Sequence, residues 1–392
     1  MRVCRLADVA TIDSGSGFPL QYQGTQNAEF PFLKVSDMNL AGNERAIQTW
    51  NHSIAEEVRG KLRAKAFPAD ALIFPKIGAA IGTNKKRQLT RPSCVDNNVM
   101  AVVPRVELLE PDFLYFLFLA KNLNDFASAS NPPSIRKSDV ENWAVGVPSI
   151  PEQRRIVDQL SRAEGIVRLR REAERCAAEL IPALFLDLFG DPATNPKGWP
   201  EQRLGDIAEV VSGVTKGRKF GDKQTVDVPY LRVANVQAGH IDLAVLKTIE
   251  VLPREVEQLA LQRGDVVLTE GGDFDKLGRG ALWEHDVTNC IHQNHVFRVR
   301  LTQSVALPEF FVTYLQARKA REYFLRCAKR TTNLASINMT QLRALPVVLP
   351  SMEVQREFLD HFDATRSIQS QQSAATAKAQ AAFDALLARS FS

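Results

Sequence analysis

Apolar residues recur at alternating steps of three and four positions in two long stretches of the chain. This spacing is typical of a helix that packs against another helix. In the first stretch the apolar positions stand among charged residues, and we expect a seam formed by Ile166, Leu169, Ala173, Cys176, Leu180 and Ala183. In the second stretch the expected seam is smaller and more polar, and therefore weaker: Phe362, Thr365, Gln369, Gln372, Thr376, Ala379, Phe383 and Leu386.

The residues around the first stretch indicate where its helix begins and ends. Ser149 and Glu152 have the spacing of a capping box, and Pro151 falls in the first turn, where its missing N–H costs nothing. Pro182 should kink or shorten this helix, and Gly190 should end it.

Outside these stretches the pattern predicts mixed strands and helices. Short runs rich in β-branched or aromatic residues, bounded by Gly, Pro or Asp, predict strands at residues 32–35, 69–74, 230–233 and 264–269. Apolar runs that begin at Pro111 and Pro308 predict helices. We therefore expect an α+β chain.

The same blocks occur twice along the chain. Residues 148–156 return at 350–358, a displacement of 202 from residue 148 to residue 350, and residues 6–10 return at 204–208. A period this long exceeds the roughly 20 to 50 residues of a solenoid repeat, so the repeated object is a whole domain with its helix. This divides the chain into a globular domain (1–148), a central helical region (149–190), a second globular domain (191–348) and a C-terminal helical region (349–392).

The two predicted helices allow two arrangements. Each could lie on the surface of its own domain, or the two could pack against each other, antiparallel, as a spacer. Their equivalent positions after the two domains favour the spacer, because a pseudo-twofold axis would bring the two seams together. About 30 helical residues would extend roughly 45 Å, a little more than one turn of DNA.

Composition narrows the class of protein further. The 392 residues are 45% hydrophobic and 24% charged, which is usual for a soluble globular protein, and no run of 18 apolar residues predicts a membrane span. Five scattered cysteines argue against a disulfide framework. Because the repeated block begins at residue 6, we expect no signal peptide and a cytoplasmic protein. The net charge of +4 means that any nucleic-acid surface must come from local clusters.

The order of these blocks resembles the specificity (S) subunit of type I restriction-modification systems. The resemblance covers essentially the whole length and rests on the doubled Pro-Ser…Gln-Arg helix starts, the block at 264–269 and the glycine-rich segment 271–280. It implies two tandem α/β target-recognition domains, related by a pseudo-twofold axis and separated by two long helices in an antiparallel coiled coil. It also implies a DNA-binding, non-catalytic subunit that takes part in defence against foreign DNA.

The resemblance further implies that each domain reads half of a bipartite double-stranded DNA target. The helices would space the halves and carry two adenine methyltransferase (M) subunits, which restriction (R) subunits join. S-adenosylmethionine, ATP and Mg²⁺ would belong to those partners, and this chain would hold no cofactor. Two alternatives remain open: a stand-alone DNA methyltransferase or nuclease, and a duplicated adaptor that binds protein.

Catalytic and metal motifs are weak in this sequence. The glycine-rich turn at 13–17 imitates an S-adenosylmethionine loop, but its counterpart at 211–215 keeps one glycine, so a tight turn explains both. Residues 131–134 read Asn-Pro-Pro-Ser, with serine where amino-methyltransferases need an aromatic ring to stack on a flipped base. Cys290, His292 and His295 could ligate a metal, but the first half offers only Cys94 there. We predict no catalytic residue and no metal site.

Cationic and amide side chains on loops are the remaining candidates for DNA contact. Lysine and arginine neutralise phosphates, whereas arginine, asparagine and glutamine can read bases. The glycines at 271–280 suggest a loop that enters a DNA groove, with Arg279 as a reader. The candidates in the first half are Lys76, Asn84, Lys85, Lys86, Arg87, Arg136 and Lys137. Those in the second half are Lys216, Arg218, Lys219, Asp273, Lys276, Arg279, Thr332 and Asn333.

Overall fold

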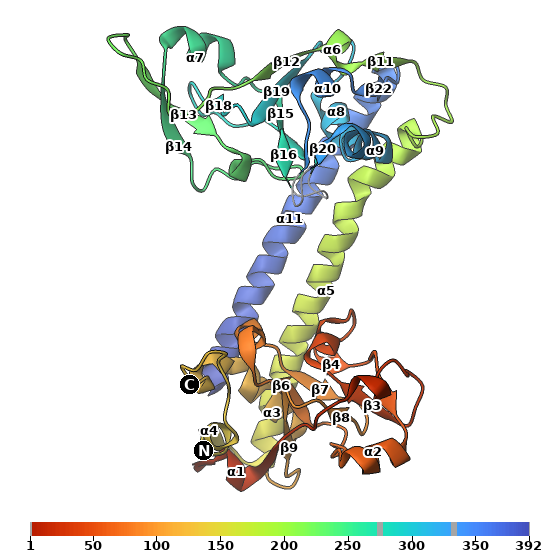
Figure 1. Ribbon diagram of the computed structural model, residues 1–392, viewed down its shortest axis with the longest axis vertical. Coiled ribbons are helices and arrows are strands. Elements are labelled where there is room, and N and C mark those ends of the chain that lie inside the picture. The colour runs from red at the N-terminus through yellow and green to blue at the C-terminus, as the bar shows by residue number, and fades with distance from the viewer. Residues whose placement is uncertain (1, 273–276, 331–334, 392) are drawn as a thin grey trace. The chain divides into compact units, whose positions relative to one another are not determined.

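The computed structural model describes residues 2–272, 277–330 and 335–391. The described chain forms two compact units, residues 1–171 with 375–392, and residues 172–374. Each unit therefore combines one globular domain with part of both long helices, which cuts across the four segments expected from the sequence. The α+β class is confirmed by the mixed helix and strand content of both units (Figure 1).

The first domain is built around a five-stranded sheet with the order β2-β9-β6-β7-β4. A three-stranded sheet, β5-β3-β8, and the antiparallel pair β1-β10 complete it. Its strands are β1 (Arg2–Arg5), β2 (Ala10–Ser14), β3 (Phe30–Leu33), β4 (Ala46–Ile47), β5 (Ser53–Ile54), β6 (Leu72–Pro75), β7 (Arg87–Leu89), β8 (Cys94–Val95), β9 (Val99–Pro104) and β10 (Ala144–Val147). Its helices are α1 (Leu6–Val9), η1 (Leu20–Tyr22), η2 (Val35–Asn39), α2 (Glu56–Leu62), η3 (Gly78–Thr83), α3 (Pro111–Ala120), η4 (Leu123–Phe126) and α4 (Lys137–Glu141).

The second domain repeats this plan with one more small sheet. Its sheets have the orders β12-β19-β15-β17, β14-β13-β18, β16-β21-β20 and β11-β22. Its strands are β11 (Glu201–Arg203), β12 (Ala208–Ser212), β13 (Val226–Leu231), β14 (Lys247–Val251), β15 (Val266–Thr269), β16 (Gly271–Gly272), β17 (Gly280–Leu282), β18 (Ile291–His292), β19 (Val296–Leu301), β20 (Lys329–Arg330), β21 (Ala335–Ser336) and β22 (Pro346–Val348). Its helices are α6 (Leu204–Ile207), η5 (Val233–Asn235), α7 (Pro253–Leu259), α8 (Pro308–Tyr314), α9 (Arg318–Cys327) and α10 (Met339–Arg343).

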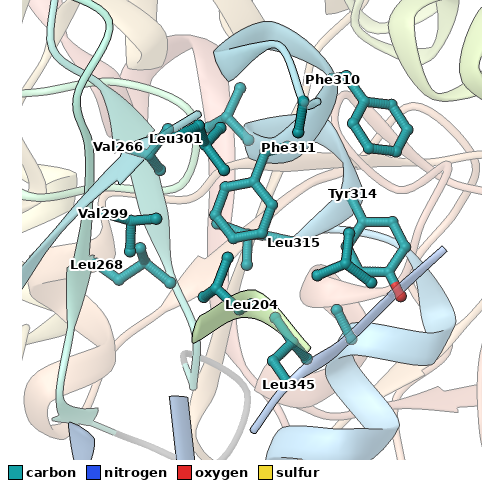
Figure 2. Close-up of a cluster of buried hydrophobic side chains, with 14 of the residues drawn as sticks. Leu204, Val266, Leu268, Val299, Leu301, Phe310, Phe311, Tyr314, Leu315 and Leu345 are labelled. Carbon is teal, nitrogen blue, oxygen red and sulfur yellow. The ribbon is translucent and has the colours of Figure 1, made fainter. Parts of the chain in front are cut away.

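Alternating side chains explain how the second domain builds its core. Val266 and Leu268 of β15 pair with Val299 and Phe297 of β19, which gives the sheet one continuous apolar face. Figure 2 shows this face meeting the buried side chains of α8, including Phe311. The predicted strands and helices at these positions are confirmed.

The two long helices, α5 (Ile150–Phe189) and α11 (Met352–Phe391), each contain 40 residues. α5 continues through Pro182, so the expected shortening at that residue was wrong, and Gly190 ends the helix with a φ of 75°. The carboxylate of Glu152 is bound to Arg155 at 2.6 and 2.8 Å, and the capping box stays a prediction.

Within each unit the two long helices run side by side, antiparallel (Figure 1). In the first unit Arg171 donates to the Gln380 Oε1 at 2.8 Å, and Val167 shares a buried cluster with Phe383. In the second unit Gln369 donates to the carbonyl oxygen of Ala177 at 2.8 Å, and the rings of Phe185 and Phe358 lie 5.9 Å apart. Within each unit the long helices therefore cover the domain core and also contact each other.

The seam predicted for α5 was partly wrong. Val167 and Ala177 are buried, whereas Leu169 and Cys176 are exposed. Ile166 is also exposed, but it lines a hollow with Phe383 and Leu386 of α11. Leu180 is also exposed, and Ala173 is half-buried. One position rotates a helix by about 100°, and apolar neighbours such as Ile166 and Val167 fit either rotation. In α11, by contrast, Phe362 and Phe383 are buried, and Ala379 and Leu386 pack against the core.

A buried glutamine joins each long helix to its domain. Gln153 accepts from the N–H of Glu110 at 2.8 Å and donates to the carbonyl oxygens of Leu108 and Pro148, both at 2.9 Å. Gln355, displaced by 202 residues, makes the same three kinds of bond in the second unit, to Leu307, Val305 and Pro350. Both side chains are fully buried. The repeated glutamine is therefore a structural clamp that fixes the start of each helix.

Candidate nucleic-acid interface

Three of the predicted cationic residues come together at one edge of the first domain. Lys76 follows β6, and its Nζ donates to the Ser14 Oγ at 2.9 Å. The N–H of Ile135 donates to the carbonyl oxygen of Lys76 at 2.9 Å, which brings the exposed Arg136 and Lys137 to the same edge. Residues far apart in the sequence thus form one positive surface.

The charge of this surface is organised by Asp13. The Lys137 Nζ lies 2.9 Å from the Asp13 Oδ1, and Lys65 is bound to the other carboxylate oxygen. Burial opposes ionisation of Asp13, but the hydrogen bonds from Lys65 and Lys137 outweigh it and lower the pKa of the carboxyl. Lys65 is half-exposed and was missed in the sequence, because nothing local indicates that residue 65 reaches Asp13.

The second cationic group of this domain serves its interior, which corrects the prediction for Lys86. That side chain is 2% exposed, and its Nζ donates to the Asn84 Oδ1 at 2.7 Å and to the carbonyl oxygen of Lys121 at 2.8 Å. Burial lowers the pKa of Lys86 to about 8. Asn84 also accepts from the N–H of Leu123 at 2.9 Å. The amine that was expected to bind a phosphate therefore links Asn84 to the backbone at Lys121 inside the domain.

The neighbours of Lys86 are also engaged within the domain. Arg87 donates to the carbonyl oxygens of Lys86 at 2.8 Å and of Met38 at 3.1 Å. Lys85 is partly exposed and bonds to the amide oxygen of Asn39. Arginine that binds carbonyl oxygens in this way must break those bonds before it can read a base.

In the second domain the connection from β12 to β13 carries the predicted cations. Lys216 and Lys219 are exposed. Arg218 forms a bidentate ion pair with Glu255 of α7, at 2.6 and 3.0 Å, and its bonds with that carboxylate raise the pKa of the guanidinium. The two lysines are therefore better placed than Arg218 to meet a phosphate.

Gly271 and Gly278 pack closely against their own domain, and entry of this loop into a DNA groove stays a prediction, because residues 273–276 lie outside the described residues. A Cβ on Gly278 would lie 2.2 Å from the Phe324 ring, and one on Gly271 would lie 2.8 Å from the carbonyl oxygen of Ala335. Arg279 is half-buried and donates to the Gln237 Oε1 at 2.7 Å. The remaining candidates lie outside the described residues: Asp273, Lys276, Thr332 and Asn333.

Gly15 and Gly213 are needed for a close backbone crossing rather than for the tight turn expected from the sequence. A Cβ at Gly15 would lie 2.1 Å from the carbonyl oxygen of Val95, and one at Gly213 would lie 1.8 Å from that of His292. In both domains the next residue forms a parallel bridge to the strand being crossed. The repeated glycine is thus explained by the fold.

The cysteine and histidine residues considered as metal ligands have other surroundings. Cys290 and His292 are fully buried, whereas His295 is exposed and contacts Glu270. The His292 Nδ1 lies 2.6 Å from the carbonyl oxygen of Val296, and burial lowers the pKa of the ring to about 4. Within the described part of the chain, no group of three or more His, Cys, Asp and Glu side chains is arranged to hold a metal ion.

Comparison with known proteins assigns the class. The family described as the type I restriction modification DNA specificity domain matches residues 1–174 and 196–376, and the chain belongs to this family. The match therefore places one DNA specificity domain in each half of the chain. None of the helices within residues 2–272, 277–330 and 335–391 has the length and apolar character that a membrane span requires.

Individual relatives cover the chain to different extents. The MjaX specificity subunit of Methanocaldococcus jannaschii is 27% identical over 172 residues, which are 43% of this chain and 40% of that protein. The EcoKI specificity subunit of Escherichia coli is 28% identical over 169 residues, 42% of this chain and 36% of that protein. These matches span less than half of each relative. The crystal structure of an S subunit from M. genitalium shares the fold, with a TM-score of 0.55, 13% identity and coverage of 100% of this chain and 96% of that one.

Proposed function

We propose that this chain is the DNA-reading subunit of a type I restriction-modification complex, and that each domain binds one half of a bipartite duplex target. The duplicated domain plan in a member of the specificity family carries this proposal. Each domain has exposed cations that could neutralise phosphates, Arg136 in the first and Lys216 and Lys219 in the second. Base reading would come from loop side chains set on the same scaffold.

The long helices would carry two adenine methyltransferase (M) subunits, which restriction (R) subunits would join in the cytoplasm. Exposed apolar side chains support this part of the proposal, because a partner surface would cover them. Ile166, Leu169 and Leu180 of α5 are 54%, 57% and 44% exposed. S-adenosylmethionine, ATP and Mg²⁺ would be bound by those partners, so the chain itself would need only DNA and protein contacts.

Salt-dependent DNA binding tests the proposal against its alternatives. The chain with its M subunits should bind random duplex with an affinity that falls steeply with salt, whereas a protein-binding adaptor would show no such dependence. Lys216→Ala and Lys219→Ala should each weaken binding to all sequences and reduce the slope of log K against log salt by about 1. Lys61→Ala is the control, because this exposed lysine of the first domain pairs with Glu57 on α2.

Mapping methylated adenines in cells that carry the complex tests the bipartite target. We expect two short sequences separated by a constant spacer. Lengthening both α5 and α11 by whole turns should change the spacer and leave the half-sites unchanged, since a helix of 40 residues is about 60 Å long and adds about 5.4 Å per turn. A continuous methylated sequence would contradict the proposal, and methylation by the purified chain alone would support the stand-alone enzyme.

A further inference from the structure

The first domain is joined to α5 by an ion pair in which the helix supplies the carboxylate. Glu164 of α5 accepts from Arg45 at 2.5 Å and from the Tyr115 hydroxyl at 3.0 Å. Arg45 also binds Asp112 at 2.6 Å, and its guanidinium lies 4.9 Å from the centre of the Tyr115 ring. The pair is partly shielded from solvent, with the Glu164 side chain 24% exposed. These contacts fix the Arg45 guanidinium next to Glu164 of α5.

The second domain is joined to α11 by an ion pair of the opposite polarity. Here the helix supplies the guanidinium, and Arg366 donates to both carboxylate oxygens of Glu284, at 2.7 and 2.8 Å. The hydrogen bond from Arg366 lowers the pKa of Glu284. Glu309, at the start of α8, adds a second carboxylate near Arg366.

Glu164 and Arg366 occupy equivalent positions in the two halves. Each lies eleven residues after its buried clamp glutamine, Gln153 or Gln355, on a helix that begins in the same way. The paired residues Arg45 and Glu284 do not correspond, since Arg45 precedes β4 whereas Glu284 follows β17. The second carboxylates do correspond, since Asp112 and Glu309 each follow the proline that begins α3 or α8. The same position of the repeat therefore carries a negative charge in α5 and a positive charge in α11. Each charge pairs with a residue from a different part of its own domain.

We propose that these two ion pairs, here called latches, are positioning contacts that restrict each domain to its own helix. With arginine at position 164, the first domain would hold two guanidinium groups, those of residues 45 and 164, with the carboxylate of Asp112 left to pair with one of them. With glutamate at position 366, the second domain would bring three carboxylates together, including those of Glu284 and Glu309. Like charges at such separations repel, so each latch attracts the native helix and disfavours the other. A duplicated chain needs this distinction, because its two helices begin alike and their clamps are identical.

The test compares reversed and neutral substitutions in the full-length chain. Glu164→Arg should lower the Tm of unfolding by about 4 °C or more, Glu164→Gln by less, and the double variant Arg45→Glu with Glu164→Arg should recover at least half of the loss. Arg366→Glu, Arg366→Gln and the double variant Glu284→Arg with Arg366→Glu should give the same order. The control is Asp158→Arg on the exposed side of α5, where Asp158 pairs with Arg162 at 3.0 Å, and it should change the Tm by about 1 °C or less.

The order of the variants decides the proposal. If reversal and neutral substitution cost the same, the latches attract but do not discriminate, and the proposal is overturned. Failure of both double variants to recover stability would also overturn it, because the losses would then reflect local damage rather than charge pairing. If a reversed variant does not fold, the neutral variant and the double variant still separate these outcomes.

Discussion

The buried His292 makes a quantitative prediction about acid sensitivity. Its Nδ1 donates to the carbonyl oxygen of Val296, and its Nε2 is buried without a hydrogen-bond partner. A proton on Nε2 would place a charge and an unsatisfied donor in the core, with Arg298 adding repulsion. Burial, as the main cause, lowers the pKa from 6.5 to about 4.

The sign and size of the effect follow from this pKa. Because the folded pKa lies below the unfolded one, the unfolded chain binds the proton more readily, and stability is lost as the pH falls from 6.5 towards 4. A shift from 6.5 to about 4 corresponds to a loss of about 3 kcal/mol, most of it reached by pH 4.5. At neutral pH the His292 ring is uncharged, so none of this stability is lost.

Urea unfolding at pH 7.0, 5.5 and 4.5 measures the loss in the native chain and in His292→Asn. Asparagine keeps a donor that can reach the carbonyl oxygen of Val296 but does not titrate in this range. The variant should start less stable and lose about 2.5 kcal/mol less than the native chain between pH 7.0 and pH 4.5. Carboxylates titrate in both chains and cancel in the comparison. Parallel losses in the two chains would refute the reasoning.

Three further predictions concern buried contacts. Lys86→Met should remove a gain of up to about 3 kcal/mol that the native chain shows as the pH rises from 8 to 10.5, measured by urea unfolding. Gly15→Ala should cost at least about 3 kcal/mol, because the new Cβ would meet backbone oxygens. Gly17→Ala is the control and should change the unfolding midpoint little, because nothing lies within 4 Å of a Cβ at that position. Equal effects of the two variants would contradict the close backbone crossing at Gly15. Gln153→Leu leaves three backbone groups without their side-chain partner and should cost about 3 kcal/mol, and a loss under 1 kcal/mol would argue against the clamp.

Periodicity and duplication were enough to predict the class of fold. The seam of α11 was found because Phe362 and Phe383 are isolated large apolar residues in a polar helix. The seam of α5 was misplaced because Ile166 and Val167 are adjacent and similar, and only the surrounding structure decides which is buried. Local pattern fixes the period of a helix more securely than its rotation.

The cationic candidates show a second limit of the sequence. Lys85 and Lys86 are adjacent and chemically identical, yet one is partly exposed and the other is buried. The difference arises from the carbonyl oxygen of Lys121, which is 35 residues away in the chain and close only after folding. Arg218 is likewise engaged by a residue distant in the sequence, Glu255. A run of cationic residues therefore predicts a DNA-binding surface without showing which side chains are available to bind DNA.

The packing of α11 also affects how the chain is synthesised. Phe383 and Phe391 lie 6.4 and 5.2 Å from the rings of Phe116 and Phe113, so the hydrophobic core of the first unit includes side chains from the end of the chain. On the ribosome, the first domain emerges early but must wait for residues 383–391 before this core is complete. Its apolar surface therefore stays open during translation, when nascent chains are most exposed to aggregation and chaperones.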